Sequence, residues 1–205
     1  MAITPLISNH RGTHLVTNRS QPGPFGWLSA RGRLCAPLLG TGVADRDLFQ
    51  GFTLQAVDAK GRVSIPADLR TVLEHNNGGP ENRLALIGRD SALGCLVGYD
   101  TAWARERNER LNALTRIAEE EGRAIDLAAR RRDNRVERVA YDPSGRIVLP
   151  AYERDKAGIA NWAFFAGDGD QFQIWAPARL LADTAGDEDL QDRCRYAMKL
   201  KGVAL

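Results

Sequence analysis

The chain has 205 residues, of which 43% are hydrophobic and 7% aromatic, and its formal net charge at pH 7 is +2. A chain of this length and composition buries a core, and no apolar run approaches the about 18 residues of a membrane helix. Its N-terminus lacks the basic start and apolar stretch of a secretion signal. Its three scattered cysteines argue against a disulfide framework and for a reducing cytoplasm.

Residues 1–47 differ from the rest of the chain. They contain QPGP at positions 21–24 and show no sustained period of 2 or 3.6, so we expect a disordered extension or upstream sequence added by an early start codon. This segment holds five arginines and two aspartates, which leaves residues 48–205 with a net charge of −1. A nucleic-acid binder with so neutral a body must concentrate positive charge on one surface, or multiply it by oligomerising.

Residues 48–100 are predicted to form a ββαββ unit. Its first two strands are expected at residues 52–57 and 62–65, with a turn at 58–61 between them. A helix at residues 66–75 and two further strands at 84–87 and 95–99 are expected to follow. Gly61 is free to adopt the positive φ of a hairpin loop that joins the first two strands. Pro66 suits the first position of the helix, whose buried stripe is spaced i, i+3, i+4 at Leu69, Val72 and Leu73.

Residues 101–135 are predicted to be a helical connector, and residues 136–180 to be a second ββαββ unit. The connector is rich in arginine and has a narrow apolar stripe at Leu111, Leu114 and Ala118. In the second unit, the first two strands are expected at residues 136–141 and 146–149, with a turn at 142–145 between them. A helix is expected at residues 150–157, and two further strands at 163–166 and 171–175. Gly158 suits a left-handed helix end, and residues 181–205 are expected to form a C-terminal helix or tail.

The two units share a duplicated segment. Residues 57–70 read VDAKGRVSIPADLR and residues 141–154 read YDPSGRIVLPAYER, a match without a gap at an offset of 84 residues. The identical pairs are Asp58/Asp142, Gly61/Gly145, Arg62/Arg146, Pro66/Pro150, Ala67/Ala151 and Arg70/Arg154. Such a self-match indicates one duplicated supersecondary unit. Two equivalent arginine-bearing turns suit a protein that reads a repeated target, because an active site rarely needs its chemistry twice.

The paired DAKGR and DPSGR turns resemble those of the MraZ family of bacterial transcriptional regulators, in the AbrB-like swapped-hairpin superfamily. The resemblance covers about residues 48–175. It implies an α+β, mainly β fold, in which two tandem ββαββ units form a pseudo-twofold swapped-hairpin barrel with a helical insert and a C-terminal helix. It also implies a cytoplasmic, nucleoid-associated repressor of the division and cell-wall operon. Such a protein would bind double-stranded DNA, at G-rich direct repeats in its own promoter, as a homo-oligomeric ring.

Carried onto this chain, the resemblance implies that Lys60, Arg62 and Arg146 face the DNA, with Ser144 in the place that lysine has in the first turn. An arginine fork can donate two hydrogen bonds to guanine O6 and N7, and a lysine can contact phosphate. Structural support for the arginines would come from the carboxylates and glycines of the turns, Asp58, Asp142, Gly61 and Gly145. The alternative is a salt bridge that only closes each turn.

Two other functions compete with this one. An AbrB-like antitoxin would normally carry one hairpin copy, and a ring-forming assembly module would use the arginines in subunit contacts. No Walker loop, nucleophile elbow or HExxH pattern is found, so we expect no enzyme, no cofactor, no small-molecule substrate and no membrane partner. A metal site at His10 and His14, or at Asp168 and Asp170, is not expected. The arginine run at 130–132 is expected to be a solvated face, and the aromatic residues near the C-terminus a core or subunit contact.

Overall fold

The computed structural model describes residues 46–90, 92–124, 135–183 and 186–204. The described residues all belong to one unit, Gly42–Leu205. The predicted extension up to residue 45, with His10 and His14, and the arginine run at 130–132 lie outside the described residues. Within the described ranges, no helix is both long and apolar enough to cross a membrane.

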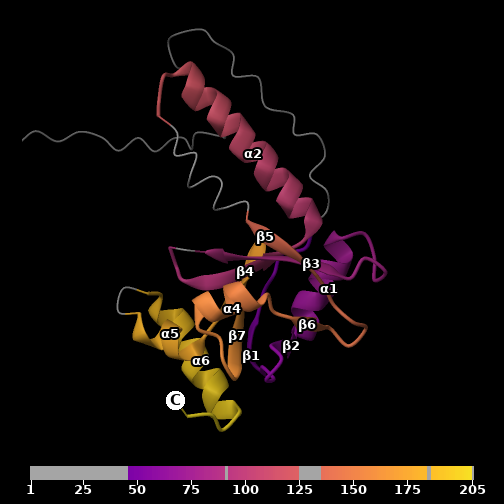
Figure 1. The fold of residues 1–205 in the computed structure, drawn as a ribbon, viewed down its shortest axis with the longest axis vertical. Helices are drawn as coiled ribbons and strands as arrows, with labels where there is room; N and C mark the ends of the chain where they lie inside the picture. Colours follow the sequence, from indigo (N-terminus) through magenta and orange to yellow (C-terminus); the bar gives the residue numbers. More distant parts are fainter. Residues whose placement is uncertain (1–45, 91, 125–134, 184–185, 205) are drawn as a thin grey trace, which may run out of the picture. The chain divides into compact units, whose positions relative to one another are not determined.

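The described unit is an α+β structure dominated by strands, as the sequence predicts (Figure 1). The strands are β1 (Phe52–Ala56), β2 (Arg62–Ser64), β3 (Leu84–Asp90), β4 (Cys95–Tyr99), β5 (Val136–Ala140), β6 (Arg146–Val148), β7 (Trp162–Asp168) and β8 (Gln171–Trp175). The helices are α1 (Ala67–Asn76), α2 (Thr101–Glu120), α4 (Ala151–Ala157), α5 (Pro177–Ala182) and α6 (Glu188–Leu200). Gly158 ends α4 at a φ of 72°, the left-handed conformation predicted for it.

The strands pair in a pattern that relates the two repeats by a pseudo-twofold axis. An antiparallel six-stranded sheet has the order β1-β7-β8-β4-β3-β5, and β2 and β6 form a separate two-stranded sheet. Exchanging each strand for its counterpart in the other repeat reverses the order and leaves it unchanged. The register obeys the same rule, since the pair Phe52↔Ala166 corresponds to Val136↔Gly88. The first strand of each repeat therefore pairs with the third strand of the other.

The predicted hairpin between the first two strands of each repeat is wrong, whereas the last two strands of each repeat pair with each other, β3 with β4 and β7 with β8. The turn after β1 is closed by a 3.0 Å hydrogen bond from Asp58 N to Arg62 O, but β1 and β2 then enter different sheets. β1 pairs with β7, and β2 pairs with β6. The physical reason is burial: Val63 of β2 and Ile147 of β6 pair directly across the axis and are both buried in one shared core.

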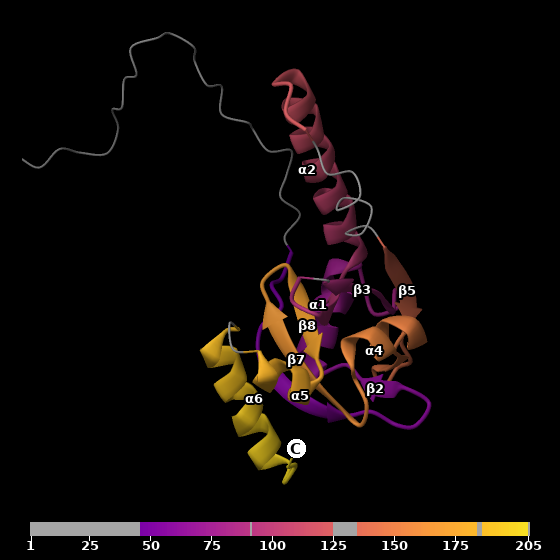
Figure 2. The ribbon, with the colours of Figure 1, turned by 60° about the vertical axis from the view of Figure 1, so that its left-hand side comes forward.

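Two apolar clusters hold the unit together. The first gathers residues of both repeats, including Leu69 and Leu73 of the predicted α1 stripe, with Phe49 and Phe172 at a ring-centroid distance of 5.3 Å. The second lies where α5 and α6 cover β1 and β7 (Figure 2), and it includes Phe164, Trp175, Cys194 and Met198. The aromatic residues predicted as core, with the exception of the half-buried Trp162, are buried.

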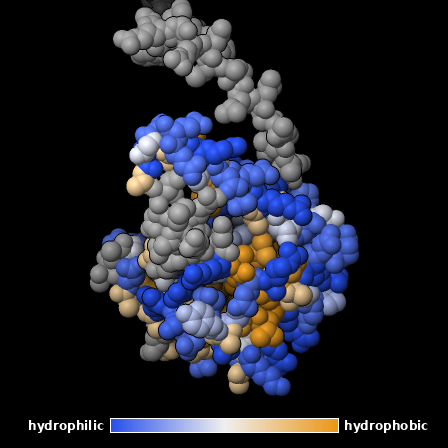
Figure 3. Space-filling view, turned by 45° about the horizontal axis from the view of Figure 1, so that its top comes forward, coloured by the Kyte–Doolittle hydropathy of each residue, from blue (hydrophilic) through white to orange (hydrophobic). Residues whose placement is uncertain are grey.

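Helix α2 projects from the sheet and buries none of its residues (Figures 1 and 2). Of its predicted apolar stripe, Leu111 and Ala118 are half-buried and Leu114 is 62% exposed. Ile117, which the predicted stripe did not include, is 45% exposed. Hydrophilic residues cover most of the face in Figure 3, and an apolar strip remains open near its centre. The helix is described to Glu120, and residues 125–134 of the predicted connector lie outside the described ranges.

A buried carboxylate anchors the start of α2. Asp100 is fully buried and accepts hydrogen bonds from Trp103 N at 2.7 Å, Asn76 Nδ2 at 3.0 Å and Arg46 Nη2 at 2.6 Å. The Arg46 side chain is 9% exposed and also pairs with Asp170 at 2.8 Å. Arg46 thus joins the start of α2 to the β7–β8 turn, and Asn76 at the end of α1 bonds both to Asp100 and to the backbone of Asp47. The folded unit therefore includes the last two residues of the segment predicted as an extension.

We expect Asp100→Ala to lower the free energy of unfolding by about 3–5 kcal/mol, because it leaves the Arg46 guanidinium buried without its main counter-charge. Urea titration followed by circular dichroism measures this loss. Asp189→Ala removes the partner of an exposed arginine, Arg193, and serves as the control with a much smaller change. Equal losses in the two variants would contradict the buried-charge account.

Candidate nucleic-acid interface

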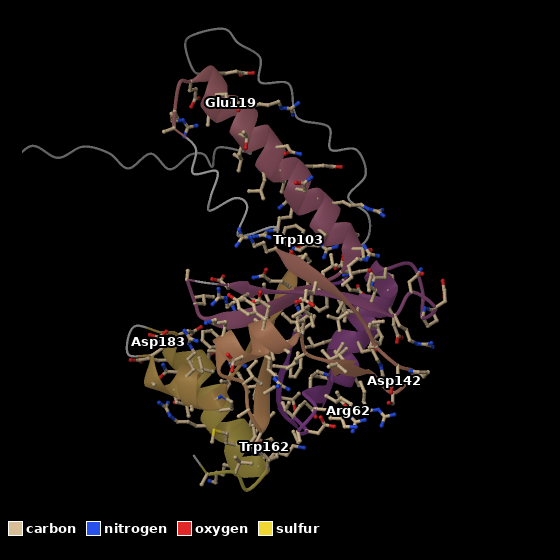
Figure 4. The ribbon with its side chains drawn as sticks, viewed as in Figure 1. Arg62, Trp103, Glu119, Asp142, Trp162 and Asp183 are labelled. Carbon is tan, nitrogen blue, oxygen red and sulfur yellow. The ribbon has the colours of Figure 1, made fainter. Side chains whose placement is uncertain are left out.

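The two-stranded sheet presents Arg62 and Arg146 on one exposed face. In the β2–β6 ladder Arg62 lies opposite Val148, and Ser64 lies opposite Arg146. Since side chains alternate along a strand, these four residues share one face, while the pair between them is buried on the other. Arg62 and Arg146 are diagonal neighbours, which places their Cα atoms about 7–8 Å apart. We call this exposed surface the arginine face; Figure 4 shows Arg62 beside the second turn.

Each arginine is held by the aspartate of its own turn. In the first turn (Asp58–Gly61), Asp58 Oδ1 accepts from the backbone N–H groups of Lys60 and Arg62, and Oδ2 accepts from Arg62 Nε at 2.5 Å. In the second turn (Asp142–Gly145), Asp142 Oδ2 accepts from Arg146 Nε at 2.8 Å. The geometry is the one expected if the aspartates orient the arginines.

The second turn has one additional bond. Ser144 donates its backbone N–H and, at 2.6 Å, its hydroxyl to Asp142 Oδ1. This hydroxyl, with the N–H and guanidinium of Arg146, holds the pKa of the Asp142 carboxyl well below its ordinary value. In the first turn, the N–H and guanidinium of Arg62 lower the pKa of Asp58. Both carboxylates therefore stay ionised at neutral pH.

The arginines keep donors available for a ligand. Arg62 and Arg146 side chains are 55% and 63% exposed, and each uses only Nε in its ion pair. Within the described ranges, no acceptor binds their terminal Nη groups. An ion pair this exposed is weak, so the guanidinium can keep its Asp contact or leave it when a ligand offers acceptors. Lys60 is also exposed beside Arg62 and uses its backbone N–H, not its ammonium, in the turn.

The repeats complete each other's turns. Leu149 N donates to Gly61 O at 3.0 Å, and Ile65 N donates to Gly145 O at 2.8 Å. Gly61 and Gly145 have positive φ values of 77° and 80°, as the predicted turns require.

Two arginines that the sequence analysis did not assign to the site, Arg70 and Arg154, each lie against the turn of the other repeat. The Arg154 guanidinium lies where a Cβ at Gly61 would stand, and the Arg70 guanidinium lies within 2.9 Å of a Cβ built at Gly145. Arg154 has no carboxylate partner among the described residues, whereas Arg70 lies 3.8 Å from Glu74. The identity of Arg70 and Arg154 in the duplicated segment was the signal that could have found them.

The remaining candidate groups do not form a site. Asp168 and Asp170 flank the tight connection between β7 and β8, as predicted, and no group of three or more metal-ligating side chains occurs in the described ranges. Cys95 and Cys194 are buried, and burial raises the pKa of their thiols to about 12 and about 11. Thiols held protonated in this way are poor nucleophiles.

Curated proteins similar to this chain include several named transcriptional regulator MraZ. The protein of Rhodospirillum rubrum is 38% identical over 136 residues, which cover 65% of this chain and 83% of the relative. That of Stenotrophomonas maltophilia is 32% identical over 149 residues, or 71% and 95% of the two chains. That of Ruegeria pomeroyi is 36% identical over 136 residues, or 63% and 78%. No model of a protein family matches the chain.

We expect Ser144→Ala to raise the pKa of Asp142, because the hydroxyl bond is the largest cause of its lowering. Carboxyl ¹³C NMR titration measures this change. A lowered folded-state pKa means that the stabilising contribution of the ionised turn is complete above the ordinary pKa of about 3.9 and is lost as pH falls through the folded value. The variant should lose it at higher pH. Asp58, which has Lys60 at the corresponding position, is the internal control, and a shift at Asp58 of equal size would refute the local cause.

Replacing Gly61 tests the crossed arginine. Gly61→Ala and the control Gly169→Ala both place a side chain at positive φ, so each should cost about 1–2 kcal/mol in urea titrations. Only Gly61→Ala should also displace Arg154, since a Cβ at Gly169 meets open space. The displacement is measured as a shift of the Arg154 Nε–H cross-peak in ¹H–¹⁵N spectra. An unmoved cross-peak in a folded Gly61→Ala protein would count against the contact.

Proposed function

This chain belongs to the MraZ family of transcriptional regulators, and we propose that it regulates transcription by binding double-stranded DNA through the arginine face. In this proposal Arg62 and Arg146 read guanines, and Lys60 and Ser144 contact phosphate or the groove edge. Asp58 and Asp142 orient the arginines, and Gly61 and Gly145 shape the turns.

The observation that carries the proposal is the free pair of Nη groups on two arginines of one face. A guanine presents O6 and N7 side by side in the major groove, and a guanidinium with free donors matches both. The Cα separation of about 7–8 Å spans about two base-pair steps of 3.4 Å, so both arginines reach one short stretch of groove. Each good bidentate contact discriminates against the wrong base by about 1–3 kcal/mol.

The crossed turns support the swapped-hairpin, AbrB-like arrangement. Each turn takes its backbone partner from the other repeat, and Arg70 and Arg154 extend the positive charge of each turn from the helix of the other. We propose that these two arginines support the turns and contact phosphates. The two AbrB-like units, residues 48–100 and 136–180, then act as one reading head, with the connector and the C-terminal helix outside it.

A single chain offers only a few base contacts, so we further propose that it acts as a homo-oligomer, a ring on the direct repeats of its own promoter. Linking several reading heads raises the effective concentration of each at its repeat. The open apolar strip in Figure 3 and the exposed Leu114 and Ile117 supply surface for contacts between copies. As such a repressor of the division and cell-wall operon, it would act in the cytoplasm at the nucleoid.

Arg62→Ala is expected to abolish selective binding to the promoter while it leaves the mass of the oligomer unchanged. Gel-shift titration against promoter and scrambled DNA measures affinity, and light scattering measures mass. The matched control is Arg193→Ala, which removes another exposed arginine that pairs with an aspartate four residues away. Promoter selectivity retained by a folded Arg62→Ala protein would reject the proposal. Loss of the oligomer would indicate that the arginine serves subunit contacts.

A further inference from the structure

A cavity of about 750 Å³ lies between the start of α2, strand β3 and the edge strand β5. Its wall carries four arginines, Arg83, Arg105, Arg107 and Arg138. Among the described residues that line it, Glu81 supplies the one carboxylate. The cavity therefore concentrates positive charge in a body that is nearly neutral as a whole. It is formed by the connector and the edge of the large sheet, and it shares no residue with the arginine face.

Three arginines of the cavity, Arg83, Arg105 and Arg138, differ from others in the described unit, because no carboxylate among the described residues pairs with them. Arg46, Arg89, Arg110 and Arg193 each pair with a carboxylate.

In the cavity, Arg83 Nε is buried without a hydrogen-bond partner. Arg105 and Arg138 have no carboxylate partner in the described ranges, and the Arg107 guanidinium lies 6.0 Å from the ring centroid of Tyr99. Unsatisfied burial and mutual repulsion both cost free energy, and a bound anion would remove both costs.

The cavity also has an apolar floor, and hydrogen bonds fix a polar side chain, Asn77, at its rim. Leu86 and Tyr99 are buried at its base, beside Val136. At its rim Asn77 donates from Nδ2 to Leu84 O at 2.7 Å and accepts from the Thr101 hydroxyl at 2.9 Å. Small-molecule sites combine such a floor with a few polar groups in about 300–1,000 Å³. A DNA duplex presents its phosphates on a convex surface and would not reach this floor.

We propose that this cavity binds a small organic anion that carries at least two phosphate groups, of the nucleoside diphosphate class. Guanidinium groups bind phosphate oxygens in bidentate pairs, so the three that have no carboxylate partner, Arg83, Arg105 and Arg138, match two phosphates better than one. The organic part of the ligand packs on the apolar floor. The site adjoins the second turn, because Tyr141 N, next to Asp142, donates to Arg83 O at 3.1 Å.

Isothermal titration of the full chain with ADP and with AMP tests the site. ADP should bind, AMP should bind at least tenfold more weakly, and Arg83→Gln combined with Arg105→Gln should weaken ADP binding at least tenfold. Arg116→Gln removes an exposed arginine from the same helix outside the cavity and should leave ADP binding unchanged. Arg62→Ala should leave it unchanged as well, which separates this site from the arginine face. The single variant Arg105→Gln, at an exposed helix position, gives the same test if the double variant fails to fold.

Several results would overturn the proposal. They are no ADP binding at millimolar concentration, unchanged ADP affinity in the cavity variants, or loss of ADP binding in Arg62→Ala. If ADP fails to bind and the cavity variants lower the salt dependence of promoter binding, the arginines contact DNA phosphates instead. If ADP fails to bind and the variants change the oligomer mass, the cavity is a contact between copies. Promoter binding by the wild-type chain is measured in parallel, so that the two functions fail separately.

Discussion

The pairing of β2 with β6 is the constraint on which the arginine face depends. Each strand has three residues, too few to form a stable sheet alone, and each is hydrogen-bonded to the corresponding strand of the other repeat. The pairing buries Val63 against Ile147, and the period of two then turns the residues on either side toward solvent. Burial of one residue per strand thus determines that Arg62 and Arg146 share a face.

The pairing of β2 with β6 also means that each turn is held by contacts from both repeats. A backbone N–H from one repeat binds the glycine carbonyl of the other, and an arginine from one helix packs over the glycine of the opposite turn. The aspartates contribute locally, through acceptor atoms that point at the N–H groups of their own turns. Local bonds therefore set the shape of a turn, while contacts across the axis set its position.

The pseudo-twofold symmetry of the strands does not extend to the helices that surround them. At one edge of the large sheet, α6 packs against β1 and completes an apolar cluster. At the other edge, β5 and the exposed α2 border a cavity lined with arginines. The arginine face, to which both repeats contribute equivalent residues, lies at the pseudo-twofold axis. The arginine-lined cavity, which has no counterpart among the described residues of the other repeat, lies at one edge of the large sheet. A scaffold built by duplication thereby carries two different kinds of candidate site.

The sequence by itself determined the helices, the strands and the candidate residues, because each of these depends on a pattern among residues that are close together in the chain. Alternation predicted the strands, the spacing of Leu69 and Leu73 predicted the buried side of α1, and the duplicated turns identified Arg62 and Arg146. The tertiary structure alone decided which strands pair, that Arg70 and Arg154 cross to the opposite turns, and that four arginines line one cavity. These contacts join residues far apart in the chain, and they form because strands too short to stand alone must complete their hydrogen bonds and bury their apolar side chains elsewhere.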